Sequence, residues 1–365
     1  MKICLVGNNI TSLILAYILS KKKIYSEIYS VKSNKVNFKT RTLGLTENNI
    51  KFLSNYFNNI SKRINQIKEI KVQIKNNEIK DEILFKQNSN TLFNMISYND
   101  FKNYLTSRIK KNNFVSYKYL TKSSKFLNLL NDKKFSLIIN CERSNPLTIK
   151  YLKKGIKKNY FSKAYTTIIN HKKTLNKRAV QVFTDRGPIA YLPLSNRLTS
   201  VVFSCEIDKK KQLSENEIIE KIKFFNPNYK IISLSKIESF NLNLNLPKRY
   251  FYENLLFFGD SLHSVHPLAG QGFNMTIRDI IKLNKILEDK IDLGLSIDKS
   301  VCKEFEQVAK SYNTTFSLGI DFIYEFFSLS KSFLPKRISK NIFSFINKNP
   351  KIKNFGIKFA DQGIF

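Results

Sequence analysis

One segment of the chain, residues 259–279, concentrates side chains that could bind a flat, polar cofactor. Asp260 follows the short apolar run 254–258, and a carboxylate at the end of such a strand can accept a hydrogen bond from a ligand hydroxyl. Gly270 and Gly272 lack a Cβ, so backbone N–H groups can approach a ring closely. They open a helix whose positive end suits negative charge on that ring, and Pro267 stiffens the preceding loop. The segment therefore predicts a strand, a loop and a helix that bind a flavin.

Two simpler explanations compete for the same residues. The Pro-x-x-Gly-x-Gly part alone is equally typical of an ordinary turn into a helix, but two histidines, Ala-Gly-Gln-Gly, Asn274 and the pair Arg278-Asp279 accompany it at fixed spacing. His263 and His266 suggest a metal pair, yet no cysteine or carboxylate cluster completes a site. We therefore expect a flavin loop and no metal.

The full segment resembles the pattern G-D-A-A-H-x-x-H-P-x-A-G-Q-G-x-N-x-x-x-x-D of the class A FAD-dependent aromatic monooxygenases. The resemblance is to the ubiquinone-biosynthesis hydroxylases that act on polyprenyl phenols. Residues 41–46 (RTLGLT) are similar to the R-x-x-A-L-S segment of that family, and residues 183–194 are similar to its F-T-x-x-G-P-x-A-x-L-P-L. Residues 305–313 stand where its Y-E-x-x-R-x-x-D-N helix belongs, although Ala309 and Tyr312 replace the usual Arg and Asp.

The resemblance implies hydroxylation of the aromatic ring of a polyprenylated phenol in ubiquinone biosynthesis, with FAD as cofactor, NAD(P)H as reductant, and O2 reacting through a flavin hydroperoxide. It assigns Asp260 to the ribityl chain and Arg41 to a cofactor phosphate or the nicotinamide. Asn274 would steady the entry to the helix. The isoalloxazine would lie against Pro267, Gly270, Gln271 and Gly272, and the candidates on the substrate side are His266, Tyr191 and Pro193. Tyr191 is equally well explained as a packing residue of a sheet.

The amino terminus departs from the family. Residues 3–7 and 13–18 predict the strand, turn and helix of a dinucleotide fold, but Gly7, Asn9 and Ser12 stand where the fingerprint has three glycines. The Asn9 side chain would obstruct a pyrophosphate. By spacing, Ser30 replaces the acid that holds the adenosine ribose, and a neutral hydroxyl binds more weakly than a carboxylate. The family's Asp-Gly landmark is replaced by Glu142-Arg143.

These departures leave a second function open, in which the chain is a noncatalytic scaffold or accessory subunit of a quinone-biosynthesis assembly. The active hydroxylase is favoured because a chain that had abandoned flavin would have little reason to keep residues 269–272. A flavin-dependent reductase or halogenase is a third alternative, but the sequence contains no additional halide-site or redox-cysteine signature.

The order of predicted elements indicates an α/β fold. A discontinuous Rossmann-like FAD-binding domain of the glutathione-reductase type is expected from residues 1–60, 95–157 and 250–325. Residues 61–94 and 158–249 alternate at strand period, which predicts an antiparallel substrate-binding sheet. Residues 326–365 are expected to form basic, aromatic helices. Within the first domain, helices are expected over about 47–57, 97–109 and 274–287.

Composition bounds the remaining questions. The four cysteines, Cys4, Cys141, Cys205 and Cys302, are far apart and suit a reducing compartment. The first strand begins too early for a leader, and no window has the roughly 18 apolar residues of a membrane span, which together predict a cytoplasmic protein.

The net charge of +34 comes mostly from scattered lysines, which is typical of a compositional bias. Anionic lipid is the less favoured explanation of this charge, and no nucleic-acid partner is expected. Residues 322–359 interleave phenylalanines with lysines. They suit peripheral contact with the inner face of a membrane as well as packing on the chain's own domain.

Overall fold

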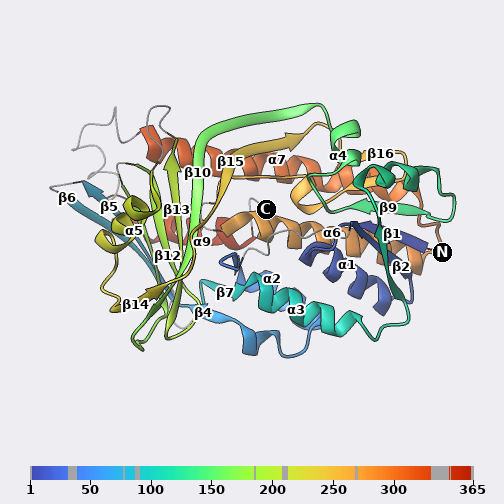
Figure 1. Ribbon diagram of the computed structural model, residues 1–365. Helices are drawn as coiled ribbons and strands as arrows, with labels where there is room; N and C mark the ends of the chain where they lie inside the picture. Colours follow the sequence, from blue (N-terminus) through green and yellow to red (C-terminus); the bar gives the residue numbers. More distant parts are fainter. Residues whose placement is uncertain are drawn as a thin grey trace.

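The computed structural model describes residues 2–31, 39–76, 79–86, 91–184, 186–207, 213–267, 270–329, 345 and 347–362. Figure 1 shows a parallel sheet with its helices at one end and a large antiparallel sheet at the other. Helices α6 (Gln271–Asp292) and α7 (Lys299–Leu329) lie between these ends, and so do the long strands β10 (Gly155–His171) and β15 (Glu238–Pro247). The α/β expectation is confirmed.

The sheet at the amino-terminal end has the strand order β16-β17-β9-β1-β2-β8 in the described part of the chain. All neighbours in it are parallel except β16 and β17. Its central strand is a continuous apolar run, Ile3 to Val6, with no exposed surface, as expected of a sheet that helices cover on both faces. The strands are β1 (Lys2–Val6), β2 (Tyr25–Val31), β8 (Val115–Leu120), β9 (Leu137–Asn140), β16 (Phe251–Tyr252) and β17 (Leu255–Phe257).

The helices of this end begin at polar caps. Asn9, Ser97 and Asn145 each accept a hydrogen bond from a backbone N–H of the first turn that follows, which satisfies a group that the helix itself leaves open. These residues cap α1 (Ile10–Lys21), α3 (Tyr98–Ile109) and α4 (Pro146–Tyr151). Short 3-10 turns connect the elements at η1 (Ile60–Arg63), η2 (Ser123–Asn131) and η3 (Gly259–Ser261).

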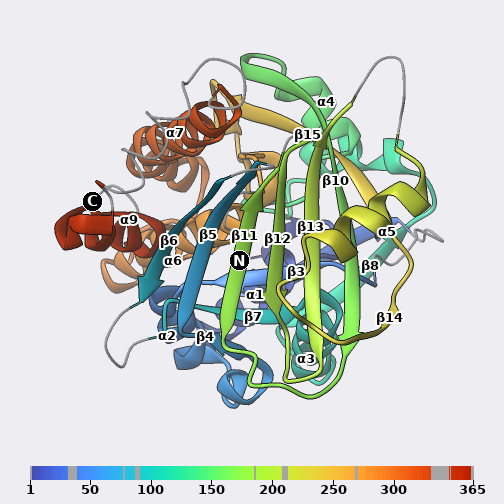
Figure 2. The same cartoon turned by 90° about the vertical axis from the view of Figure 1, so that its left-hand side faces the viewer.

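The large sheet has the order β14-β10-β13-β12-β11-β5-β6, and β15 pairs with β10. Every pairing is antiparallel except that of β5 with β11. Helix α5 (Glu215–Phe224) packs on one face of this sheet (Figure 2). The remaining strands are β5 (Glu69–Asn76), β6 (Ile79–Lys86), β11 (Arg178–Phe183), β12 (Pro188–Pro193), β13 (Leu198–Glu206) and β14 (Ile231–Leu234).

A small sheet of order β3-β7-β4 connects the two ends. It comprises β3 (Thr42–Leu45), β4 (Asn65–Ile67) and β7 (Phe93–Ser97), and α2 (Glu47–Tyr56) follows β3. Strand β4 thus pairs with β7 outside the large sheet, and β5 and β6 are the strands of residues 61–94 that join that sheet. The domain boundaries expected from the sequence stay a prediction.

Helix α9 (Pro350–Gln362) packs on its own chain. The Phe359 ring stacks on Phe316 of α7 with 4.9 Å between ring centroids, and the Asp361 carboxylate accepts hydrogen bonds from Asn48 at the start of α2. Much of the expected carboxyl-terminal segment, residues 330–344, 346 and 363–365, lies outside the described residues. Among the helices that the structure describes, none has the length and apolar character required to cross a bilayer.

Candidate functional site

The candidate site begins at the carboxyl edge of the parallel sheet. Strand β17 ends at Phe257, and the turn η3 then presents Asp260, whose side chain is 60% exposed. An Arg41 Nη2 atom lies 3.7 Å from the Asp260 carboxylate, and the Arg41 guanidinium lies 4.7 Å from the centre of the Tyr98 ring. Arg41 and Asp260 are therefore adjacent, accessible groups of opposite charge. Spacing alone gave no signal for Tyr98, which tertiary packing brings to this position.

Gly270 and Gly272, at the start of α6, differ in whether the backbone requires a glycine. Gly270 precedes the helix with a φ of 64°, a left-handed conformation that a side chain would strain. Gly272 has ordinary backbone angles, and among the described residues a Cβ there would have only Val265, at 3.9 Å, within contact distance. The protein itself therefore does not require a glycine at 272, and its absent side chain leaves room for a ligand. Leu268 and Ala269 lie outside the described residues.

Asn274 joins the loop to the small sheet and to α2. Its Nδ2 donates to the carbonyl oxygens of Gly44 (3.0 Å) and Gly270 (3.3 Å). Its Oδ1 accepts from the Thr46 backbone N–H (3.0 Å) and from Asn49 Nδ2 (2.9 Å). The side chain is almost fully buried, and three of the four bonds are buried while that to Gly270 is partly buried. The predicted role of steadying the loop is consistent with these contacts, and sequence spacing did not identify Asn49.

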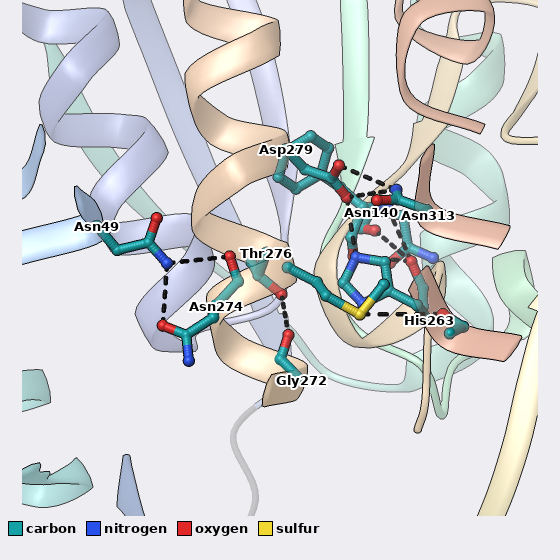
Figure 3. A network of polar contacts seen from close by, with 12 residues as sticks. Asn49, Asn140, His263, Gly272, Asn274, Thr276, Asp279 and Asn313 are labelled. Carbon is teal, nitrogen blue, oxygen red and sulfur yellow. Dashed lines mark hydrogen bonds and ion pairs between the residues drawn. The ribbon is translucent and has the colours of Figure 1, made fainter. Parts of the chain in front are cut away.

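The motif's first histidine belongs to a separate buried network on the other side of α6 (Figure 3). His263 Nε2 lies 2.8 Å from the Asp279 carboxylate, which also accepts two hydrogen bonds from Asn313 of α7. All three side chains are buried. His263 and Asp279 thus tie the loop to α6 and α7, and within the described residues no group of three metal-binding side chains forms.

His266 occupies a buried aromatic cage. Its ring stacks on Tyr324 of α7 at 4.0 Å between centroids and meets the Tyr160 ring of β10 edge-on at 5.4 Å. Neither ring nitrogen has a hydrogen-bond partner in the described structure. Burial lowers the pKa of His266 to about 3, so the ring is neutral at physiological pH. It lies directly before Pro267, where a neutral ring nitrogen could donate to or accept from a ligand.

The predicted substrate residue Tyr191 points away from this loop. Its ring is fully buried against α5, and its hydroxyl donates a 2.6 Å hydrogen bond to the carbonyl oxygen of Ile222. Burial raises the pKa of its phenol. These contacts favour the alternative in which Tyr191 is a packing residue of the sheet. Pro193, two residues later, ends β12, and its carbonyl oxygen accepts a hydrogen bond from Asn65.

The nucleotide end of the site is formed differently. Asn9 turns its side chain back into the protein, where Oδ1 caps α1 through the Ser12 backbone N–H and Nδ2 donates to the Cys141 carbonyl oxygen at 2.7 Å. Gly7 has a φ of 103°, and a Cβ there would lie 3.1 Å from the Glu142 Cβ. Ser30 stands at the carboxyl end of β2, as expected, and is nearly buried. The Asn9 amide is thus engaged with the protein, and its obstruction of a pyrophosphate stays a prediction.

Taken together, the described residues fit a FAD molecule. The flavin end offers an accessible carboxylate at Asp260, an uncrowded Gly272 and the start of an α-helix with a positive dipole. The nucleotide end keeps the strand, the Gly7 turn and the capped helix α1. The acidic residue that would bind the ribose is replaced by Ser30, near the carboxyl end of β2.

Comparison with known families supports this geometry. Residues 158–292 match the model of the FAD binding domain family, and residues 232–359 match that of the squalene epoxidase family. The chain is 28% identical over 190 residues to the mitochondrial ubiquinone biosynthesis monooxygenase COQ6 of Dictyostelium discoideum, a match of 42% of this chain and 38% of that protein. It is 28% identical over 167 residues to 3-demethoxyubiquinol 3-hydroxylase of Escherichia coli, over 44% of this chain and 42% of that protein.

Each of these matches thus covers less than half the length of the curated relative.

Solved structures show that the fold is shared. The p-nitrophenol 4-monooxygenase PnpA from Pseudomonas putida superposes with a TM-score of 0.78 and 14% identity, covering 99% of this chain and 98% of that one. The tetrameric form of 2-methyl-3-hydroxypyridine-5-carboxylic acid oxygenase gives a TM-score of 0.68 at 12% identity, with coverages of 91% and 93%. The resemblance inferred from the motifs is confirmed: the chain has the fold of FAD-dependent monooxygenases and is similar in sequence to the ubiquinone-biosynthesis hydroxylases.

Proposed function

We propose that the protein is a FAD-dependent monooxygenase that hydroxylates the aromatic ring of a polyprenylated phenol in ubiquinone biosynthesis. The observation that supports the proposal is the set of an accessible Asp260 carboxylate, an uncrowded Gly272 and a buried Asn274, which together suit a cofactor cradle. The two curated relatives described above have names that place them in the metabolism of ubiquinone, which favours this substrate class.

Each residue of the loop has a task in this proposal. Asp260 accepts hydrogen bonds from the ribityl chain, and Arg41 balances the charge of a phosphate or contacts the nicotinamide. The N–H groups at residues 270–272 stabilise negative charge on the ring, while Pro267 shapes its reactive side. Asn274 holds this backbone against β3. When bound, FAD would supply the redox chemistry, which is hydride acceptance from NAD(P)H and activation of O2. The protein orients the aromatic ring of the substrate and excludes water.

The direct test has two stages. Purified protein is incubated with FAD, passed through gel filtration and examined for the visible flavin spectrum. It is then supplied with NADH or NADPH, O2 and a prenylated phenol of short chain length, and the product is analysed by mass spectrometry. Retained flavin and a product heavier by one oxygen atom support the proposal, whereas a folded protein that cannot be reconstituted with FAD contradicts it.

A second candidate is a noncatalytic subunit of a quinone-biosynthesis assembly. The observations that favour it are Ser30 in place of the ribose acid and Asn9 in place of the second glycine of the fingerprint. Deleting the gene should cause a hydroxylation-deficient quinone precursor to accumulate. If an Asp260→Ala variant restores the quinone as well as wild type does, the protein acts without its flavin site.

We also propose a cytoplasmic location with peripheral contact to anionic membrane lipid. Support comes from the carboxyl-terminal helix, where Phe355 is 70% exposed and Lys351 and Lys358 face solvent, although the opposite side of α9 packs on the chain itself. The test is flotation with liposomes of phosphatidylglycerol and phosphatidylcholine. Failure to float with anionic liposomes removes the membrane contact and leaves packing on α7 as the role of α9.

A further inference from the structure

The large sheet has one closed face and one open face. Residues that alternate along its central strands, such as Val180, Tyr191 and Val201, pack with Ile218 and Ile222 of α5 into a single buried cluster. Because successive side chains of a strand point to opposite faces, the residues between them must lie on the other face. On that other face, α9 lies beside Phe85 of the edge strand β6, and no counterpart of α5 covers the central strands in the described structure.

A row of side chains crosses the open face. The strand register places Val72, Gln181, Ala190 and Val202 side by side on β5, β11, β12 and β13. All four are partly exposed, although they lie on interior strands of the sheet, whereas their neighbours Val182, Ile189 and Phe203 on the closed face are buried. Exposed surface in the middle of a sheet indicates that space has been left above it.

The chain around Arg41 packs on the sheet beside this row. The Thr42 and Ser200 hydroxyls lie 3.0 Å apart, and the Thr40 and Thr166 hydroxyls lie 2.9 Å apart. These contacts bring the segment that carries Arg41 down onto the sheet.

Apolar packing closes two further sides of the row. Ala179 packs with Met95 of β7. Val202 itself packs against the same buried cluster as Val265 of the flavin loop. The partly exposed row therefore lies between the sheet and the loop that holds Pro267, where a substrate of the proposed reaction has to bind.

We propose that Gln181 determines substrate specificity in this space by forming a hydrogen bond with the phenolic oxygen of the substrate. Gln181 is the polar member of the row, and its amide has no hydrogen-bond partner within the described residues. Its neighbours Val72, Ala190 and Val202 are small aliphatic groups that suit the face of an aromatic ring. A primary amide can donate to a phenolate or phenol oxygen and can accept from a phenol hydroxyl.

This inference rests on the proposed function, since it assigns the polar contact within that site. An unpaired amide in an apolar surrounding favours a ligand that can pair with it and disfavours one that cannot. Gln181 should therefore favour substrates that carry a phenolic oxygen, while Val72, Ala190 and Val202 contact the face of the aromatic ring. The hydrocarbon tail is recognised independently of Gln181.

The experiment compares two ligands that differ only in this oxygen. FAD-reconstituted wild type is titrated with 2-geranylphenol and with geranylbenzene, and binding is followed through perturbation of the flavin absorbance. Wild type should bind the phenol about tenfold more tightly, the value of one net hydrogen bond. The variants Gln181→Leu and Gln181→Met should retain FAD, bind geranylbenzene as wild type does, and prefer the phenol by no more than about twofold.

Gln73→Leu is the matched control. Gln73 lies on the adjacent strand β5, opposite Val182, and its side chain bonds Glu82 on the closed face. It should keep the wild-type preference for the phenol. The inference is overturned if the Gln181 variants keep that preference, or if wild type retains FAD but does not distinguish the ligands. Both of these results would leave FAD binding, and with it the proposed function, intact. Loss of flavin from wild type would contradict the proposed function as well.

Discussion

The two ends of the cofactor site are built on different principles. At the flavin end, Asn274 makes three buried hydrogen bonds that connect α6 with β3 and α2, and His263 and Asp279 make a second buried network. At the nucleotide end, Asn9 replaces a glycine and caps its own helix, and Ser30 replaces a carboxylate. The flavin end is therefore held by hydrogen bonds between distant segments of the chain, while at the nucleotide end Asn9 is accommodated because its amide bonds its own helix and the Cys141 carbonyl oxygen.

The largest effect is expected from Asn274→Ala at the flavin end. Thr46 N–H and the carbonyl of Gly44 would lose a buried partner, and each such loss costs about 1–3 kcal/mol, so the free energy of unfolding should fall by about 3 kcal/mol. FAD retention should fall with it. Urea denaturation and the flavin spectrum measure both effects.

Asn284→Ala is the control for this variant, since Asn284 lies on the same helix and its amide donates to the neighbouring Glu288. It should cost less than about 1 kcal/mol. Equal losses of stability in the two variants would contradict the view that the Asn274 network holds the flavin end together.

The second prediction concerns pH. The unfolded chain takes up a proton on His266 near its ordinary pKa of about 6.5, whereas the folded chain does so only near pH 3. Between these values the unfolded state binds more protons, so the free energy of unfolding falls as pH falls, by about 2 kcal/mol at pH 5. His266→Phe should remove this contribution. Urea denaturation at pH 7.5 and pH 5 tests it, and an unchanged pH dependence in the variant would refute it.

The third prediction separates cofactor binding from folding. Asp260→Ala removes a carboxylate whose side chain is 60% exposed, so stability should change little. FAD affinity should fall about tenfold, the value of one charge-assisted hydrogen bond. Fluorescence titration of the apoprotein with FAD measures the affinity. Asp289→Ala, at an exposed position of α6, should leave the affinity unchanged, and a comparable loss there would argue against a specific role for Asp260.

The smallest effect is expected at the nucleotide end. Asn9→Gly should cost about 1 kcal/mol of stability, because the bond to the Cys141 carbonyl is lost while a glycine cap remains acceptable. FAD affinity should rise about threefold, since a glycine allows closer approach of a pyrophosphate. The control is Asn145→Gly, the equivalent cap of α4, which should lose stability without gaining affinity. An unchanged affinity in Asn9→Gly would mean that Asn9 does not obstruct the cofactor.

The fold was predictable where patterns are local. The apolar run at Ile3–Val6 and the alternation around Val180 predicted the two kinds of sheet, and the helix after Gly272 was found within a few residues of its true bounds. Strand β4 was not identified from the sequence, because a three-residue strand carries little pattern of its own. Tyr191 illustrates the same limit within the site. The alternation predicted that it points to one face of the sheet, but not that α5 covers that face.

By itself, the sequence determined the flavin loop, because its glycines, carboxylate and helix start lie within about twenty consecutive residues and act through local backbone geometry. Only the tertiary structure decided which side chains surround it. Asn49 and Gly44 reach Asn274 from more than 200 positions away, and Tyr160 and Tyr324 meet at His266 from opposite sides of the chain. Which of the two faces, that of Gln181 or that of Tyr191, becomes the covered one depends on where α5 packs. That choice is made by buried area and long-range hydrogen bonds, which no short stretch of sequence contains.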